Sequence, residues 1–243
     1  MTWPSRTFFS RSLAAALLLA PLQAAPVSGR VELRDSKDAT VRKKADYSGV
    51  VVWLEPINAA PPVSKTKAPA VMDQRDKTFV PHVLAIEVGT PVSFPNSDPI
   101  FHNAFSNYNG QLFDVGLYPP GTSRTVRFNR PGIVRVFCNI HANMSAVIAV
   151  LATPYFAVTE RDGTFRIPDV PPGPYTLHVF HERATQTEIG KQTRMVGVDA
   201  NPLVIPPMTI SESGYLSIPH SNKFGHEYHN APDESGLYPA VNK

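Results

Sequence analysis

The decisive stretch of the sequence reads Val134-Arg-Val-Phe-Cys-Asn-Ile-His-Ala-Asn-Met144, and an apolar run at residues 146–151 follows it. Alternating apolar residues before Cys138 predict a strand that ends at the cysteine. A second strand is expected to begin near Met144, so that His141 lies in a tight loop between the two strands. The loop then aims a thiolate, an imidazole and a thioether at one point. Soft sulfur donors combined with imidazole favour copper.

A mononuclear copper site of this kind needs a second imidazole, and His102 is the candidate. It follows the expected strand 92–94 in a Pro-rich loop that can lie at the same end of a sandwich. Asn96, in the same loop, is expected to hydrogen-bond to the ligand loop and fix its orientation. The predicted metal ligands are thus two histidines and a cysteine in a trigonal set with a weak axial methionine, namely His102, Cys138, His141 and Met144.

Each of these residues also has a simpler interpretation. A buried cysteine is more often structural than metal-binding, and a methionine that enters a strand usually belongs to the core. Zinc is the main chemical rival because it also binds Cys and His, but Met is a poor zinc ligand. Four donors in this order, with strands between them, are hard to obtain by chance, which favours copper.

The fold class follows from short runs of Val, Ile, Phe and Tyr separated by Pro, Gly, Asn and Asp, a pattern that predicts an all-β protein made of sandwiches. The 25 prolines suit turns and strand edges. Residues 56–69 are expected to form a linker or a long exposed loop. The expected strands are residues 27–33, 50–54, 83–88, 92–94, 125–128, 133–137, 146–151, 164–167 and 175–180.

Residues 71–151 resemble the cupredoxin family, in particular its amicyanin and plastocyanin-like group. Residues 79–89, residues 92–98 and the pair His102-Asn103 resemble the first half of that family, and the Cys-x-x-His-x-x-Met loop resembles its end. The resemblance implies a Greek-key β-sandwich with one type 1 copper ion. It also implies that His141 reaches the surface through an apolar patch where redox partners dock. Asn143 departs from the family, in which an aromatic residue often precedes the methionine.

A second unit resembles the carboxypeptidase-regulatory, or transthyretin-like, β-sandwich family. It has a hairpin turn at Asp162-Gly163 and a Pro171-Pro172-Gly173 turn before a strand that contains Tyr175. Residues 27–33 and 50–56 resemble the opening strands of the same family. We therefore predict that residues 26–60 and 152–210 form one small sandwich into which the cupredoxin domain, residues 71–151, is inserted. Residues 211–243 are expected to form an irregular C-terminal tail.

The first 24 residues are typical of a signal peptide. Arg6 and Arg11 precede the apolar run 13–20, and small residues follow at Ala24 and Ala25. No segment of the mature chain is apolar over the roughly 20 residues that a membrane span needs, and a periplasmic location is expected. One cysteine in an exported chain cannot form an internal disulfide, but metal ligation would occupy it. The net charge is only +3 and gives no reason to expect nucleic acid as a partner, because nucleic-acid binding usually needs a clustered positive face.

The function that these features predict is transfer of single electrons, and the resemblance implies a redox partner such as a c-type cytochrome or a dehydrogenase. The whole chain resembles bacterial methylamine-utilisation or plastocyanin-like proteins. The chain is not expected to be an enzyme, because it has no His-x-His pair and the other histidines look ordinary. His178 and His181 are expected to face solvent. A copper carrier, or a non-catalytic binding or structural protein, is the alternative.

Overall fold

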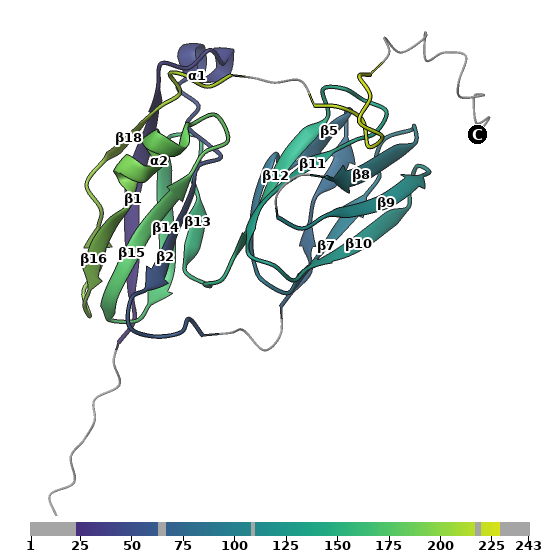
Figure 1. Cartoon of the computed structure of the whole chain (residues 1–243). Helices are drawn as coiled ribbons and strands as arrows, with labels where there is room; N and C mark the ends of the chain where they lie inside the picture. Colours follow the sequence, from purple (N-terminus) through teal and green to yellow (C-terminus); the bar gives the residue numbers. More distant parts are fainter. Residues whose placement is uncertain (1–22, 63–66, 108–109, 217–219, 229–243) are drawn as a thin grey trace, which may run out of the picture.

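The computed structural model describes residues 23–62, 67–107, 110–216 and 220–228, so the predicted signal peptide lies outside the described residues except for its last two positions. The described chain consists of two β-sandwiches and two short helices (Figure 1), which confirms the all-β fold class. Neither of these helices, within the described ranges, is long and apolar enough to cross a membrane.

The first sandwich combines strands from both ends of the chain. One of its sheets has the order β14-β1-β17, with β18 also paired to β1, and the other has the order β13-β2-β15-β16. Strands from before and after the second sandwich therefore pair directly. The strands are β1 (Ala25–Arg34), β2 (Val51–Pro56), β13 (Phe156–Val158), β14 (Thr164–Val170), β15 (Gly173–Phe180), β16 (Arg194–Val198), β17 (Leu203–Val204) and β18 (Met208–Ser211), and the helices are α1 (Ala39–Lys44) and α2 (Gln186–Gln192).

The turn before β14 shows how the sequence sets this sandwich. Gly163 has φ +83°, and a Cβ atom there would lie 2.0 Å from the carbonyl oxygen of Val31 on β1. Only glycine allows so close an approach. The side chain of Asp162 accepts a hydrogen bond from the backbone N–H of Thr164 at 2.9 Å, which closes the turn. The Asp-Gly pair therefore fixes how β14 meets β1.

The second sandwich holds the residues of the predicted copper domain. Its larger sheet has the order β6-β12-β11-β8-β9, its smaller sheet has the order β10-β7-β3, and a hairpin of β4 and β5 lies beside them. Phe94, Phe128 and Ile148 are fully buried between the sheets. The strands are β3 (Ala70–Val71), β4 (Asp73–Arg75), β5 (Thr78–Val80), β6 (Val83–Glu87), β7 (Thr90–Pro95), β8 (His102–Ser106), β9 (Phe113–Tyr118), β10 (Ser123–Phe128), β11 (Gly132–Phe137) and β12 (Ser145–Leu151).

Strand β12 is buried on both of its faces. Ile148 belongs to the core of the second sandwich, whereas Val147 and Ala149 pack with Val51 and Phe180 of the first sandwich. A strand covered on both faces needs a continuous apolar run rather than an alternating one, which explains the sequence of residues 146–151. The two sandwiches thus share an apolar junction.

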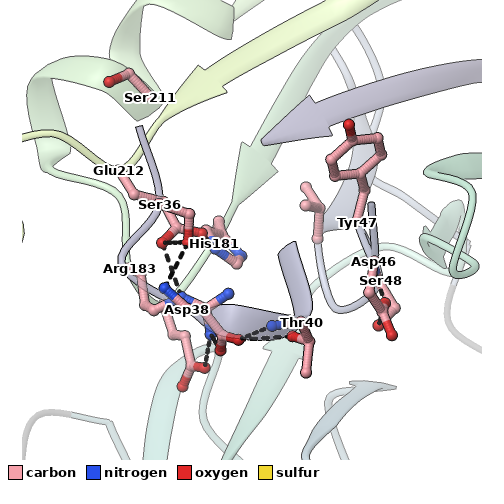
Figure 2. A network of polar contacts seen from close by, with 12 residues as sticks. Ser36, Asp38, Thr40, Asp46, Tyr47, Ser48, His181, Arg183, Ser211 and Glu212 are labelled. Atoms are coloured by element: carbon pink, nitrogen blue, oxygen red, sulfur yellow. Dashed lines mark hydrogen bonds and ion pairs between the residues drawn. The ribbon is translucent and has the colours of Figure 1, made fainter. Parts of the chain in front are cut away.

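A buried polar network stabilises the first sandwich where β18 ends (Figure 2). Glu212 accepts hydrogen bonds from Ser36 at 2.6 Å, from His181 Nε2 at 3.0 Å and from Arg183 Nε at 3.0 Å. Burial alone would raise the pKa of Glu212, but these three donors outweigh it and lower the pKa to about 2. His181 is 2% exposed, so the expectation that it faces solvent is wrong. Its ring is buried because the carboxylate of Glu212 satisfies Nε2.

At neutral pH, the Glu212→Gln variant is expected to lower the free energy of unfolding by about 1 to 3 kcal/mol, because buried donors lose a charged acceptor. The folded pKa of about 2 lies below the ordinary value of 4.5, so the carboxylate stabilises the fold above pH 4.5 and this contribution is lost as the pH falls towards 2. The difference between the two proteins should therefore shrink over that range. Urea unfolding followed by the fluorescence of Trp53, on β2 of the same sandwich, measures it.

Glu32→Gln is the control for this prediction, because Glu32 forms exposed ion pairs with Arg30 and Arg34 on β1. Exposed pairs contribute little, and a change below about 0.5 kcal/mol is expected. Equal losses in the two variants would contradict the role assigned to the network.

Candidate metal centre

Three of the four predicted ligands meet at one end of the second sandwich. Nitrogen atoms of His102 and His141 and the Sγ atom of Cys138 all lie within 4.8 Å of one another. Cys138 Sγ is 3.5 Å from Nδ1 of His141 and 3.8 Å from Nδ1 of His102. Among the described residues this is the one group of three or more His, Cys, Asp or Glu side chains whose donor atoms could hold a metal ion.

The loop between β11 and β12 carries Cys138, His141 and Met144. The backbone N–H of Cys138 donates to the carbonyl of Met144 at 3.1 Å, and the N–H of Met144 donates to the carbonyl of His141 at 3.0 Å. These two bonds close the loop and place Met144, just before β12, opposite Cys138, just after β11. Both side chains are fully buried in the core of the second sandwich. The role of Met144 as an axial ligand stays a prediction.

His102 is the first residue of strand β8, whereas the sequence predicted that it lies in a loop. It pairs with Tyr118 of β9 and is fully buried. The loop before it is closed by Asn96, whose side chain donates to the carbonyl of Ile100 at 2.9 Å. Asn96 also accepts from the backbone N–H of Asp98 at 3.1 Å. The expectation that Asn96 bonds to the ligand loop is therefore wrong, because its side chain organises its own loop.

Asp98 orients His102, and the sequence interpretation missed it. Its Oδ2 atom lies 2.6 Å from Nε2 of His102 and accepts the hydrogen bond, which leaves Nδ1 turned towards Cys138. The backbone N–H groups of Asp76 and Lys77 donate to the same carboxylate at 2.6 and 2.9 Å. Burial raises the pKa of Asp98, but these donors and His102 outweigh it and lower the pKa. A histidine ligand fixed in this way through its second nitrogen is the usual arrangement at metal sites.

Burial is the main influence on Cys138. It raises the pKa of the thiol, while backbone N–H groups, led by that of Ile140, act in the opposite direction. A metal ion binds the thiolate, so binding has to displace the thiol proton. The N–H groups around the sulfur then help to stabilise the negative charge.

The donor set fits a small, soft metal ion. Two imidazole nitrogens and one sulfur lie within 4.8 Å of one another, and the hydrogen bond to Asp98 orients the ring of His102. His141 is partly exposed, while Cys138 and His102 are fully buried. The centre therefore lies just below the surface and approaches it along the edge of His141.

No protein-family model and no curated protein matches this chain. Its structural neighbours include cupredoxins and a copper-containing nitrite reductase. A copper-containing nitrite reductase from Thermus scotoductus SA-01 is 25% identical with a TM-score of 0.34, and the match covers 40% of this chain and 25% of that one. A purple cupredoxin from Nitrosopumilus maritimus is 25% identical with a TM-score of 0.31, and the match covers 35% of this chain and 100% of that one. An amicyanin variant in its reduced Cu(I) form is 17% identical with a TM-score of 0.33, and the match covers 41% of this chain and 98% of that one.

The Asp98→Asn variant is expected to bind Cu(II) about 10 to 100 times more weakly, because an amide holds the ring of His102 less firmly than a carboxylate. Competition with a chelator of known affinity measures the change. Asp76→Asn is the matched control: it lies in the turn that donates to Asp98, and its φ of 54° suits asparagine. Unchanged copper affinity in Asp98→Asn would contradict the orienting role.

Proposed function

We propose that this chain is an exported protein that holds one type 1 copper ion on His102, Cys138, His141 and Met144 and transfers single electrons. The observation that carries the proposal is the convergence of two imidazole nitrogens and one buried sulfur within 4.8 Å. Two histidines and a cysteine with a weak axial methionine are the donor set of blue-copper electron-transfer sites. A site of this composition is suited to copper rather than to zinc, calcium or magnesium.

Each residue of the proposed copper site would have its own role. Bound copper would supply the change between Cu(II) and Cu(I). Cys138 would bind as the thiolate, His102 and His141 would bind through imidazole nitrogens, and Met144 would be a weak thioether ligand that tunes the reduction potential. Asp98 holds the imidazole of His102 in place, with its Oδ2 atom 2.6 Å from Nε2. A donor set that is already oriented reduces the rearrangement that accompanies each electron transfer.

The edge of His141 is the proposed route for electrons. His102, Cys138 and Met144 are fully buried, whereas His141 is partly exposed and Ile140 and Ala142 flank it. A redox partner such as a c-type cytochrome or a dehydrogenase would dock over this edge. Encounters of this kind have small, transient interfaces. We propose no catalytic role for the chain itself, because copper enzymes with such domains add further clustered histidines.

The proposal also covers where the protein is located and what the first sandwich does. The signal-like sequence of residues 1–24 supports a periplasmic location as part of this proposal, and metal binding would protect a lone cysteine there. The first sandwich, with its regulatory-like sequence, would act in structure or recognition and not in chemistry. A role in methylamine oxidation stays a prediction from the resemblance alone.

Reductive titration of the copper-loaded chain should consume one electron per copper ion and reverse fully on reoxidation. The Met144→Leu variant should keep this stoichiometry and show a higher reduction potential, because leucine donates no electron density to Cu(II). Met72→Leu is the matched control, since Met72 is equally buried in the same core and is not a predicted ligand. Consumption of two electrons, or none, would contradict the proposal, as would equal potentials in the two variants.

A further inference from the structure

The C-terminal residues 220–228, here called the clasp, lie against the second sandwich near the metal loop (Figure 1). The clasp has its own structure, built around Asn222. The carbonyl of Asn222 accepts from the N–H of Gly225 at 2.9 Å, and its side chain accepts from the N–H groups of Phe224 and His226. The clasp is therefore a defined turn that the chain places over one side of the metal centre.

Three consecutive residues, the last of β11 and the two that follow it, contact the clasp. The hydroxyl of Tyr228 donates to the carbonyl of Cys138 at 2.6 Å. The ring of His220 packs on that of Phe137, with centroids 4.1 Å apart. The backbone N–H of Lys223 donates to the side chain of Asn139 at 2.9 Å. The clasp therefore contacts every residue from Phe137 to Asn139.

The clasp is also anchored on strand β9. Lys223 Nζ lies 2.8 Å from Asp114 Oδ2, and the other oxygen of Asp114 accepts from the side chain of Asn103 at 2.8 Å. Asn103 directly follows the ligand His102. The clasp thus contacts Cys138 through Tyr228, and it contacts the strand pair β8–β9, which carries His102, through Lys223.

Tyr228 and His220 supply the contacts of the clasp with Cys138 and Phe137. Their rings meet edge to face with centroids 5.1 Å apart, and Tyr228 Oη lies 3.3 Å from His220 Nδ1. Burial raises the pKa of Tyr228 and lowers that of His220. The two rings contact Cys138 and Phe137 through a hydrogen bond and ring packing.

We propose that Tyr228 is a positioning residue for Cys138. We also propose that the seated clasp, meaning the clasp packed on the second sandwich, and the bound metal stabilise each other. The inference rests on the proposed copper site. The hydrogen bond from Tyr228 fixes the carbonyl of the residue that supplies the sulfur, and so restricts the loop to the conformation that binds. Coupling between two binding events is reciprocal. If the clasp tightens copper binding by some factor, copper must favour the seated clasp by the same factor.

The first test compares the full-length Tyr228→Phe variant with the native chain. Loss of one hydrogen bond should weaken copper binding about 3- to 10-fold, and it should shift the Cu–thiolate absorption band, because the geometry at sulfur changes. Tyr215→Phe is the matched control: Tyr215 lies in the same C-terminal stretch but outside the clasp, and neither quantity should change. An unaltered affinity and an unaltered band in Tyr228→Phe would overturn the inference.

The second test measures the seating of the clasp itself. Trypsin cleavage between Lys223 and Phe224, followed by mass spectrometry, reports the population of the released clasp when release is fast relative to cleavage. Copper should slow this cleavage in the native chain, and it should protect Tyr228→Phe less. Equal cleavage with and without copper would overturn the inference. A chain that binds copper without an intense visible band contradicts the proposed function, but copper protection of Lys223 in that chain would still support the clasp.

Discussion

The candidate site depends on the register between β11 and β12. Phe137 pairs with Ser145, and one further backbone bond, from Cys138 N–H to the carbonyl of Met144 at 3.1 Å, closes the loop. A shift by one residue would turn Cys138 away from the core, because alternate residues of a strand face opposite sides. The buried faces of β12 prevent that shift, since one face fills the core of the second sandwich and the other packs on the first. The packing of the two sandwiches therefore helps to hold the ligands in place.

Much of the fold could be predicted from short-range patterns. The runs at residues 133–137 and 146–151 became β11 and β12, and the Asp162-Gly163 turn lies where the sequence placed it. Very short strands were missed, because two residues such as Leu203–Val204 carry no periodicity and are defined by their partner. Strand β8, residues His102–Ser106, was missed altogether, because the prolines before His102 indicated a loop.

The candidate site was harder to predict in the parts that rest on long-range contacts. The spacing of Cys138, His141 and Met144 is local, and the sequence shows it. Asp98 and Tyr228 act through contacts with His102 and Cys138 that only the folded chain creates. An aspartate in a loop and a tyrosine in a polar tail carry no signal of such roles. For the same reason, His181 looked like a solvent-facing residue until Glu212 supplied its partner.

The most direct measurement is the visible absorption spectrum of the purified mature chain after addition of Cu(II), repeated on Cys138→Ser. We expect an intense Cu–thiolate band at about 600 nm that bleaches on reduction and is absent from the variant. A weak spectrum in the native chain, or an intense band that persists in Cys138→Ser, would contradict the claim that His102, Cys138 and His141 form a type 1 copper site.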